Sequence, residues 1–253
     1  MLDAVSSSEG YDSHDAIQVI KSLQEDPDTN EEDLFKVEWA YLPLLNEHHG
    51  ATPSYLESRL ATDPAFFCEL IRIIYRSEKK PKTDDEPTES QKALAQNAWR
   101  LLHEWRTPPG TMSEEGFSGD NFKQWINTAT ASASESGHLK VALTNIGSVL
   151  IHSPRDPDGL SLHHAVAEVL NASDFDGMRR GYSTAIFNAR GVHCVDLTGK
   201  PEKELADKYR HQAKEMENAG YQRLAATLRG VTESYEREAK RIIDDHENEE
   251  RED

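Results

Sequence analysis

The sequence predicts an all-α fold, an irregular array of about ten helices that ends in a long αα-hairpin. Helix-start signals recur along the chain, as at Thr52-Pro53, Asp63-Pro64 and Thr88-Glu89. Asp and Thr accept hydrogen bonds from the free amides of a first turn, and Pro fits there because its missing N–H is not needed. Each start is followed by apolar residues at helical spacing, which indicates a succession of short amphipathic helices.

The helices are expected to pair as αα-hairpins, because short turns rich in Pro or Gly join them. Such pairs resemble the repeating units of an α-solenoid. The sequence has no repeat of fixed period, so a helical bundle stays open as the alternative to a solenoid-like stack.

The first half of the chain contains four predicted helices. Asp26-Pro27-Asp28 ends the first, and Pro43 should kink or end the second near Leu42. The second helix is apolar on two sides, which is typical of an interior helix that packs against two neighbours. The expected helices cover residues 14–25, 29–42, 53–61 and 64–76.

The second half contains seven more predicted helices. The stretch after Thr107-Pro108-Pro109-Gly110 is expected to be loop as far as Gly119, and residues 190–199 do not fit a helix. The last two helices should form the hairpin across Gly220, because the apolar residues of the second approximate heptad spacing, which suits antiparallel pairing. The expected helices cover residues 88–106, 120–135, 138–152, 160–171, 173–189, 201–218 and 220–247.

Residues 77–88 carry no large apolar side chain and include two prolines, which predicts a linker or an exposed loop. This loop would separate two helical subdomains. The expected organisation is an unstructured N-terminus at 1–12, an N-terminal subdomain at 13–76, the loop at 77–88, a C-terminal subdomain at 89–247 and an acidic tail at 248–253.

The composition is strongly acidic, with 46 acidic and 28 basic residues and a formal net charge of −18. Nucleic acids and anionic membranes attract basic surfaces, so neither is expected as a partner. No apolar run approaches the length of a membrane span, and the first residues lack an apolar signal core. The two cysteines, Cys68 and Cys194, form no disulfide framework. We therefore expect a cytoplasmic protein.

Several segments carry a resemblance to other proteins. They are residues 34–45 (LFKVEWAYLPLL), 63–77 (DPAFFCELIRIIYRS), 98–110 (AWRLLHEWRTPPG), 156–159 (DPDG) and 187–192 (FNARGV). Together they resemble the C-terminal helical region of very large, mostly uncharacterised bacterial proteins. The resemblance implies a bacterial, intracellular helical module that belongs to a longer chain or complex, and it transfers no catalytic residue.

Polar residues gather where the regular helix pattern breaks, and loops on rigid scaffolds often carry function. His193 and Cys194 are adjacent, but without a third group they do not form a nucleophile–base pair. The alternative interpretation is that Asn188 and Arg190 hold the loop to helix-end carbonyl groups. The candidate ligand- or partner-binding residues are Arg179, Arg180, Tyr182, Asn188, Arg190 and His193.

The histidine doublets His48-His49 and His163-His164 could suggest metal ligands. Adjacent residues on a helix point about 100° apart, and zinc needs three or four convergent ligands. The sequence has no HExxH, no CxxC and no phosphate-binding glycine loop, so neither a metal site nor a cofactor is expected. The aromatic residues are expected in the core, with interface anchors as the alternative; they are Trp39, Tyr41, Trp99, Trp105 and Trp125.

No catalytic motif is present, so the favoured interpretation is a non-enzymatic helical scaffold or protein–protein interaction module, part of a larger bacterial protein or complex. A protein partner is expected, and the oligomeric state is left open. The first alternative is a ligand-binding or enzymatic domain with a site around residues 179–194. The weaker alternative is an acidic mimic of a nucleic acid, whose carboxylates would imitate rows of phosphates.

Overall fold

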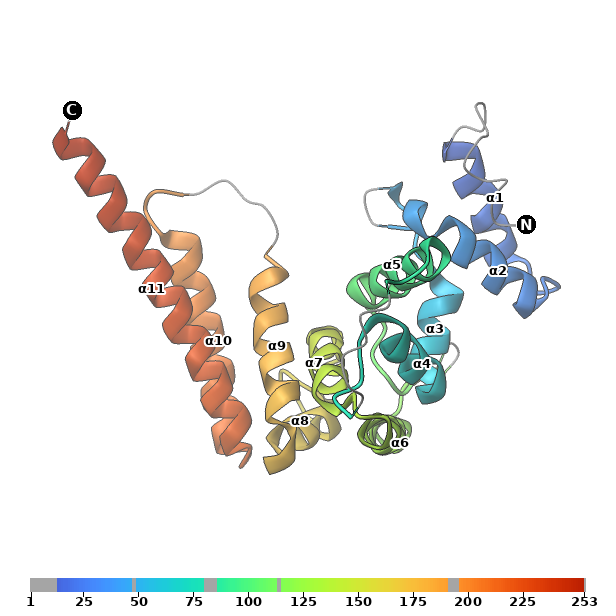
Figure 1. Cartoon of the computed structure of the whole chain (residues 1–253). Helices are drawn as coiled ribbons and strands as arrows, with labels where there is room; N and C mark the ends of the chain where they lie inside the picture. Colours follow the sequence, from blue (N-terminus) through green and yellow to red (C-terminus); the bar gives the residue numbers. More distant parts are fainter. Residues whose placement is uncertain (1–12, 47–48, 80–85, 113–114, 191–195, 253) are drawn as a thin grey trace.

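The computed structural model describes residues 13–46, 49–79, 86–112, 115–190 and 196–252. These residues form an all-α fold with a single small sheet, as the sequence predicts. The helices follow one another from α1 at one end of the molecule to the α10–α11 hairpin at the other (Figure 1). The predictions for residues 1–12 and for His48, His193 and Cys194 lie outside the described residues.

The described residues of the first half contain five α-helices and one short 3₁₀ helix, η2. Their bounds are α1 Ser13–Glu25, α2 Glu31–Tyr41, η2 Leu42–Leu44, α3 Ser54–Thr62, α4 Pro64–Ile74 and α5 Glu89–Glu104. In the second half, the part of the chain that the structure describes contains the small sheet and six further α-helices, with two 3₁₀ helices. Their bounds are β1 Thr111–Met112, β2 Gly116–Phe117, α6 Gly119–Ser136, α7 Leu139–Val149, η4 Leu150–His152, α8 His164–Asn171, η5 Ser173–Phe175, α9 Asp176–Asn188, α10 Lys200–Asn218 and α11 Gln222–Glu252.

The predicted helix starts and stops are confirmed where the responsible side chain caps its own helix. Asn30 accepts a hydrogen bond from Glu32 N at 2.8 Å, and Asp63 accepts from Ala65 N at 2.9 Å. Thr88 forms a reciprocal capping box with Gln91. The α2 helix ends just before Pro43, where the chain continues as η2. Local side-chain chemistry therefore fixes these boundaries.

The structure differs from several of the predicted elements. The predicted loop after Gly110 contains the antiparallel pair β1–β2. The helix expected from residue 160 begins only at His164, because Asp156 accepts a hydrogen bond from the backbone of that residue. The helix expected at 173–189 opens as η5 and becomes α9. The last helix is longer than expected and runs over residues 222–252, so residues 248–252 of the predicted acidic tail are part of it.

One hydrophobic cluster contains residues from both sides of the predicted loop at 77–88, of which residues 80–85 lie outside the described part of the chain. Its aromatic centre joins α4 to α5 and α6: the ring centroids of Phe67 and Trp125 lie 5.2 Å apart, and those of Phe67 and Trp105 lie 5.8 Å apart. Cys68 is buried in the same cluster, as predicted from its apolar surroundings. A smaller cluster joins α1 to the segment after α2 and contains Ile17, Ile20, Leu45 and Ala51. The two predicted subdomains thus share one core.

The α7 and α9 helices lie side by side (Figure 1) and approach so closely that two glycines are required. A Cβ atom on Gly147 would lie 2.0 Å from the carbonyl oxygen of Met178. A Cβ atom on Gly181 would lie 2.1 Å from the carbonyl oxygen of Thr144. Both obstructing atoms belong to the backbone of the facing helix, so relief would require the two helices to move apart.

We predict that Gly147→Ala and Gly181→Ala each lower the free energy of unfolding by about 1–3 kcal/mol or more, because the added methyl group overpacks the crossing. Gly230→Ala in α11 is the matched control, since nothing lies within 4 Å of the position that its methyl group would take. It should raise stability by roughly 0.5–1 kcal/mol through helix propensity. Urea denaturation followed by far-UV circular dichroism measures all three. Wild-type stability in Gly181→Ala would contradict the close crossing.

Candidate functional site

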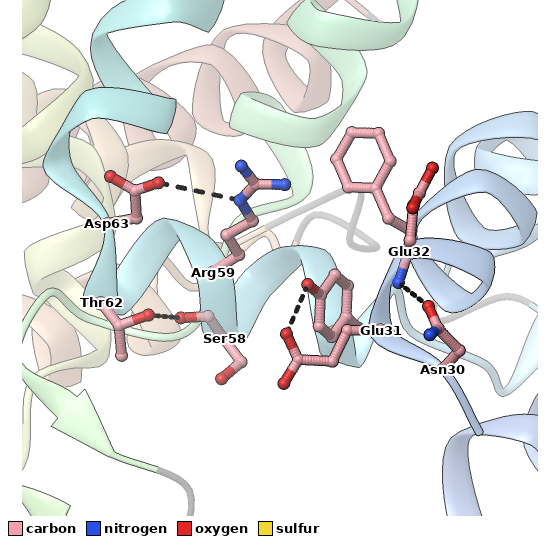
Figure 2. A pocket seen from close by; sticks show the side chains of 9 residues that line it. Asn30, Glu31, Glu32, Ser58, Arg59, Thr62 and Asp63 are labelled. Carbon is pink, nitrogen blue, oxygen red and sulfur yellow. Dashed lines mark hydrogen bonds and ion pairs between the residues drawn. The ribbon is translucent and has the colours of Figure 1, made fainter. Parts of the chain in front are cut away.

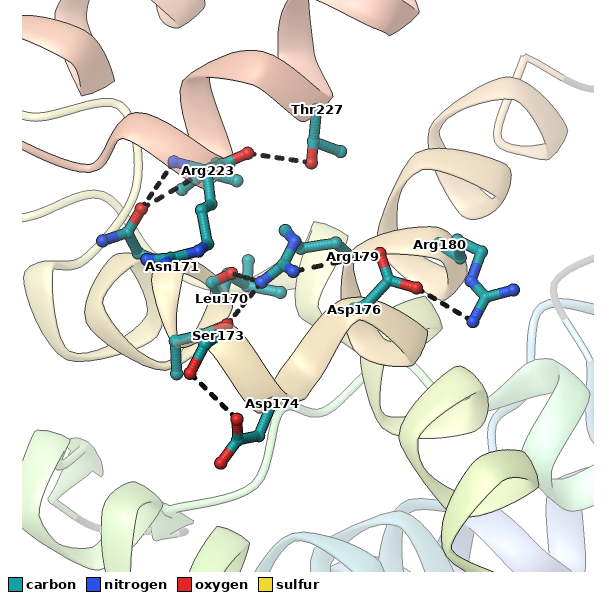
Figure 3. A network of polar contacts seen from close by, with 11 residues as sticks. Leu170, Asn171, Ser173, Asp174, Asp176, Arg179, Arg180, Arg223 and Thr227 are labelled. Carbon is teal, nitrogen blue, oxygen red and sulfur yellow. Dashed lines mark hydrogen bonds and ion pairs between the residues drawn. The ribbon is translucent and has the colours of Figure 1, made fainter.

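The predicted site residue Arg179 closes the C-terminal end of α8 rather than facing an open site (Figure 3). Its guanidinium Nη1 donates to the carbonyl oxygens of Leu170 at 2.8 Å and Ala172 at 2.6 Å. The residue is buried, and burial lowers the pKa of its guanidinium. Asn171, at the end of α8, connects this region to α11: its Oδ1 accepts a hydrogen bond of 2.8 Å from Arg223 N at the start of that helix.

Three further predicted residues lie along α9 without converging. Arg180 is exposed and pairs with Asp176 at 2.9 Å, one turn earlier (Figure 3). Tyr182 is buried in the core, and this burial raises the pKa of its hydroxyl. Asn188 is exposed at the last residue of α9. The structure therefore spreads these side chains over different faces and ends of the helix.

Arg190 lies just past the end of α9 and joins it to the terminal hairpin. Its guanidinium forms an ion pair with Glu202, in the first turn of α10, and Glu202 is fully buried. A second carboxylate, that of Glu238 in α11, lies 3.9 Å away. The alternative interpretation was that Arg190 holds helix-end carbonyl groups; in the structure Arg179 makes that contact, whereas Arg190 pairs with carboxylates.

An open hollow lies between α2 and α3 (Figure 2). The Arg59 guanidinium in the hollow sits over the ring of Phe35 at 5.2 Å and over that of neighbouring Phe66 at 4.7 Å. Acidic side chains also line the hollow, and the Tyr55 hydroxyl donates to Glu31 at 3.4 Å. The hollow is lined by Asn30, Glu31, Glu32, Phe35, Tyr55, Ser58, Arg59, Thr62 and Asp63.

Two buried carboxylates accept hydrogen bonds from backbone N–H groups of other segments, where no nearby side chain caps those groups. Glu38 of α2 accepts from Tyr55 N at 3.1 Å and Leu56 N at 2.9 Å, so it caps the start of α3 from outside. Glu57 of α3 accepts from Arg106 N at 3.3 Å and from the Thr107 hydroxyl at 2.7 Å. Burial raises the pKa of both carboxyl groups. The sequence pattern did not mark either residue, because their partners are remote in the chain.

A third polar cluster forms at the start of α8. Asp156 is buried, and its Oδ2 accepts hydrogen bonds from the backbone N–H of His164 at 2.7 Å and from its Nδ1 at 2.8 Å. These bonds, led by the backbone N–H, lower the pKa of Asp156 to about 2. His163 is the N-cap of α8, where its Nδ1 accepts from Ala165 N at 3.2 Å. The sequence pattern marked the histidine doublet but missed Asp156.

The structure sorts the aromatic residues into core and surface positions. Trp105 and Trp125 are buried, and Trp125 Nε1 donates to the carbonyl oxygen of Leu60 at 3.1 Å. Trp39 and Tyr41 are partly buried and pack against the two hydrophobic clusters. Trp99 differs from these, because half of its surface is exposed. The expected core placement is therefore wrong for Trp99.

Comparison of the chain with protein-family models, curated proteins and solved structures found no match. Among the described helices, none is both long and apolar enough to span a bilayer.

We predict that Arg190→Ala lowers the free energy of unfolding by about 3 kcal/mol or more, because it removes one partner of a buried ion pair. Arg180→Ala in α9 is the matched control. Both side chains of its pair with Asp176 are exposed, so little change is expected. Urea denaturation at pH 7 measures both. Equal stability of the two variants would show that Arg190 does not hold α9 to the hairpin.

We predict that Glu38→Gln destabilises the fold by about 1–3 kcal/mol at pH 7, because the amide leaves one buried N–H of α3 without an acceptor. The pKa of Glu38 is higher in the folded chain than the value of about 4.3 expected when unfolded. Its contribution to stability therefore grows as pH falls toward about 4.5, and the gap between wild type and variant should widen.

Urea denaturation of wild type and Glu38→Gln at pH 7 and at pH 5 measures that gap. Glu32→Gln, on the same helix, is the control, because Glu32 is exposed and its carboxylate pairs with Lys36. A gap that narrows at pH 5 would contradict the raised pKa of Glu38.

Proposed function

We propose that this chain is a non-enzymatic helical scaffold that binds a protein partner through the exposed face of α5. The observation that carries the proposal is the exposure of Trp99, whose ring stacks on His103 with centroids 4.8 Å apart. Tryptophan is enriched among residues that dominate protein–protein binding energy. A stacked ring is also held in one orientation, so binding would cost it little conformational entropy.

The surroundings of Trp99 favour a partner rather than further intramolecular packing. The first residues of α5, 89–94, are all exposed, so this part of the helix projects from the core. Leu94 lies there and is also exposed despite its size. Leu94 and Trp99 are five residues apart and point about 140° apart around the helix, so the binding face is assigned to Trp99 and His103, which are one turn apart.

The two alternative functions have less support. Arg179 and Arg190, at opposite ends of α9, are engaged in contacts that hold neighbouring helices, which leaves few of the predicted residues for a ligand. A mimic of nucleic acid needs carboxylates in rows, but many exposed acids here pair with Lys or Arg, as in Lys36–Glu32 and Arg210–Glu236. The resemblance of several segments to large bacterial proteins supports a role inside a bacterial cell as part of a larger assembly.

We predict that Trp99→Ser abolishes capture of a specific partner while the fold is retained. Tagged wild type and variant are compared by quantitative mass spectrometry of proteins captured from a lysate of the source cells. Val19→Ser is the matched control, because Val19 is an exposed apolar residue on α1. With the captured protein purified, isothermal titration calorimetry should show affinity roughly tenfold or more weaker for Trp99→Ser and unchanged for Val19→Ser.

A partner that binds wild type and Trp99→Ser equally would overturn the assignment to α5. The site around α9 is tested in parallel with the double variant Arg180→Ala plus Asn188→Ala, which avoids the buried pair of Arg190. Loss of the partner in that variant alone would favour the alternative site.

A further inference from the structure

The turn between η4 and α8 gathers three residues with metal-binding side chains. Asp156 lies within the turn, and His163 and His164 end it. One ligand-capable atom from each side chain lies within 4.8 Å of the other two. The carboxylate is buried, whereas the His164 side chain is 57% exposed, so the cluster opens to solvent on one side. We propose that Asp156, His163 and His164 form a binding site for a divalent first-row transition metal ion such as Zn²⁺.

The backbone at the start of α8 explains why an adjacent pair of histidines can converge here. Two neighbours within a helix would point about 100° apart. His163, however, is the N-cap and has extended dihedral angles of φ −56° and ψ 133°, whereas His164 is the first helical residue. Their rings therefore lie nearly parallel, with centroids 4.5 Å apart and planes 28° apart. The two histidines at this helix boundary therefore do not diverge as two neighbours within a helix would.

The turn is held in place before any metal binds. Within it, Asp156 N donates to the carbonyl oxygen of Leu160 at 3.0 Å and His163 N to that of Pro154 at 2.9 Å. From outside, Glu215 of α10 accepts a hydrogen bond from Ser161 N at 2.8 Å. The hydrogen bond between Asp156 and His164 then fixes the two side chains relative to each other. Such preorganisation lowers the cost of assembling a ligand set.

The ligand chemistry selects the class of ion. Two imidazoles and one carboxylate suit Zn²⁺, Co²⁺ and their neighbours, whereas Mg²⁺ and Ca²⁺ prefer oxygen ligands. Ligands about 2.0–2.1 Å from a tetrahedral zinc lie roughly 3.4 Å from one another. The candidate ligand atoms lie within 4.8 Å of one another, so the largest of their separations would shorten by no more than about 1.4 Å. The exposed His164 side chain has room for this movement. Three protein ligands leave a further position for water or an exogenous ligand.

The test is titration of the full chain with Zn²⁺ by isothermal titration calorimetry, with Mg²⁺ in a parallel titration. We expect one Zn²⁺ bound per chain with a micromolar or lower dissociation constant, and no heat of binding for Mg²⁺. His164→Ala and His163→Ser should each weaken Zn²⁺ binding roughly tenfold or more. Serine can cap α8 in place of His163, so a loss of binding in that variant does not reflect a lost helix start.

His211→Ala is the matched control, because His211 is an exposed histidine on α10 outside the cluster, and its affinity for Zn²⁺ should equal that of wild type. Co²⁺ gives an independent readout: its visible d–d absorption should change on binding to wild type and not to His164→Ala. Circular dichroism verifies the fold of each variant. Failure of wild type to bind Zn²⁺, or equal binding by wild type, His163→Ser and His164→Ala, would overturn the proposal.

Discussion

The contact on which the second half of the molecule depends is the crossing of α7 and α9 at Gly147 and Gly181. The backbones of the two helices are in contact there and leave no room for a methyl group at either glycine, which fixes the position of α9 against α7. The α9 helix in turn holds its other neighbours through its two ends. Arg179 at its start binds the end of α8, and Arg190 past its end binds α10 and α11. A shift at the glycine crossing would therefore reach every later helix.

Buried charged side chains connect neighbouring helices in this chain. Glu38 holds the start of α3, Glu57 holds the turn after α5, and Glu202 receives Arg190. Apolar packing alone tolerates small shifts, since it has little directional preference. A hydrogen-bonded carboxylate in a dry environment accepts one arrangement of donors, because a lost partner leaves a buried polar group. These residues specify which surfaces of the amphipathic helices meet.

The sequence predicted the features whose causes are local. Asn30, Asp63 and Thr88 cap the helices that directly follow them, and Pro43 ends α2, so the pattern alone placed these boundaries. It could not place contacts that depend on the assembled fold. The carboxylate of Asp156 delays the start of α8, and Glu38 caps a helix to which it does not belong. The candidate residues Arg179 and Arg190 were selected as polar residues near a helix break, but tertiary partners engage both of them.

The order of the helices along the chain also bears on how the molecule folds. Many of its packed pairs, such as α2 with α3, α7 with α9 and α10 with α11, join segments that are near neighbours in sequence (Figure 1). Short loops cost little entropy to close, so a topology of this kind has low contact order and is expected to fold rapidly. During synthesis, α7 and α9 emerge before the hairpin. The helices α7 and α9 can therefore pack together before α10 and α11 are synthesised and dock against α9.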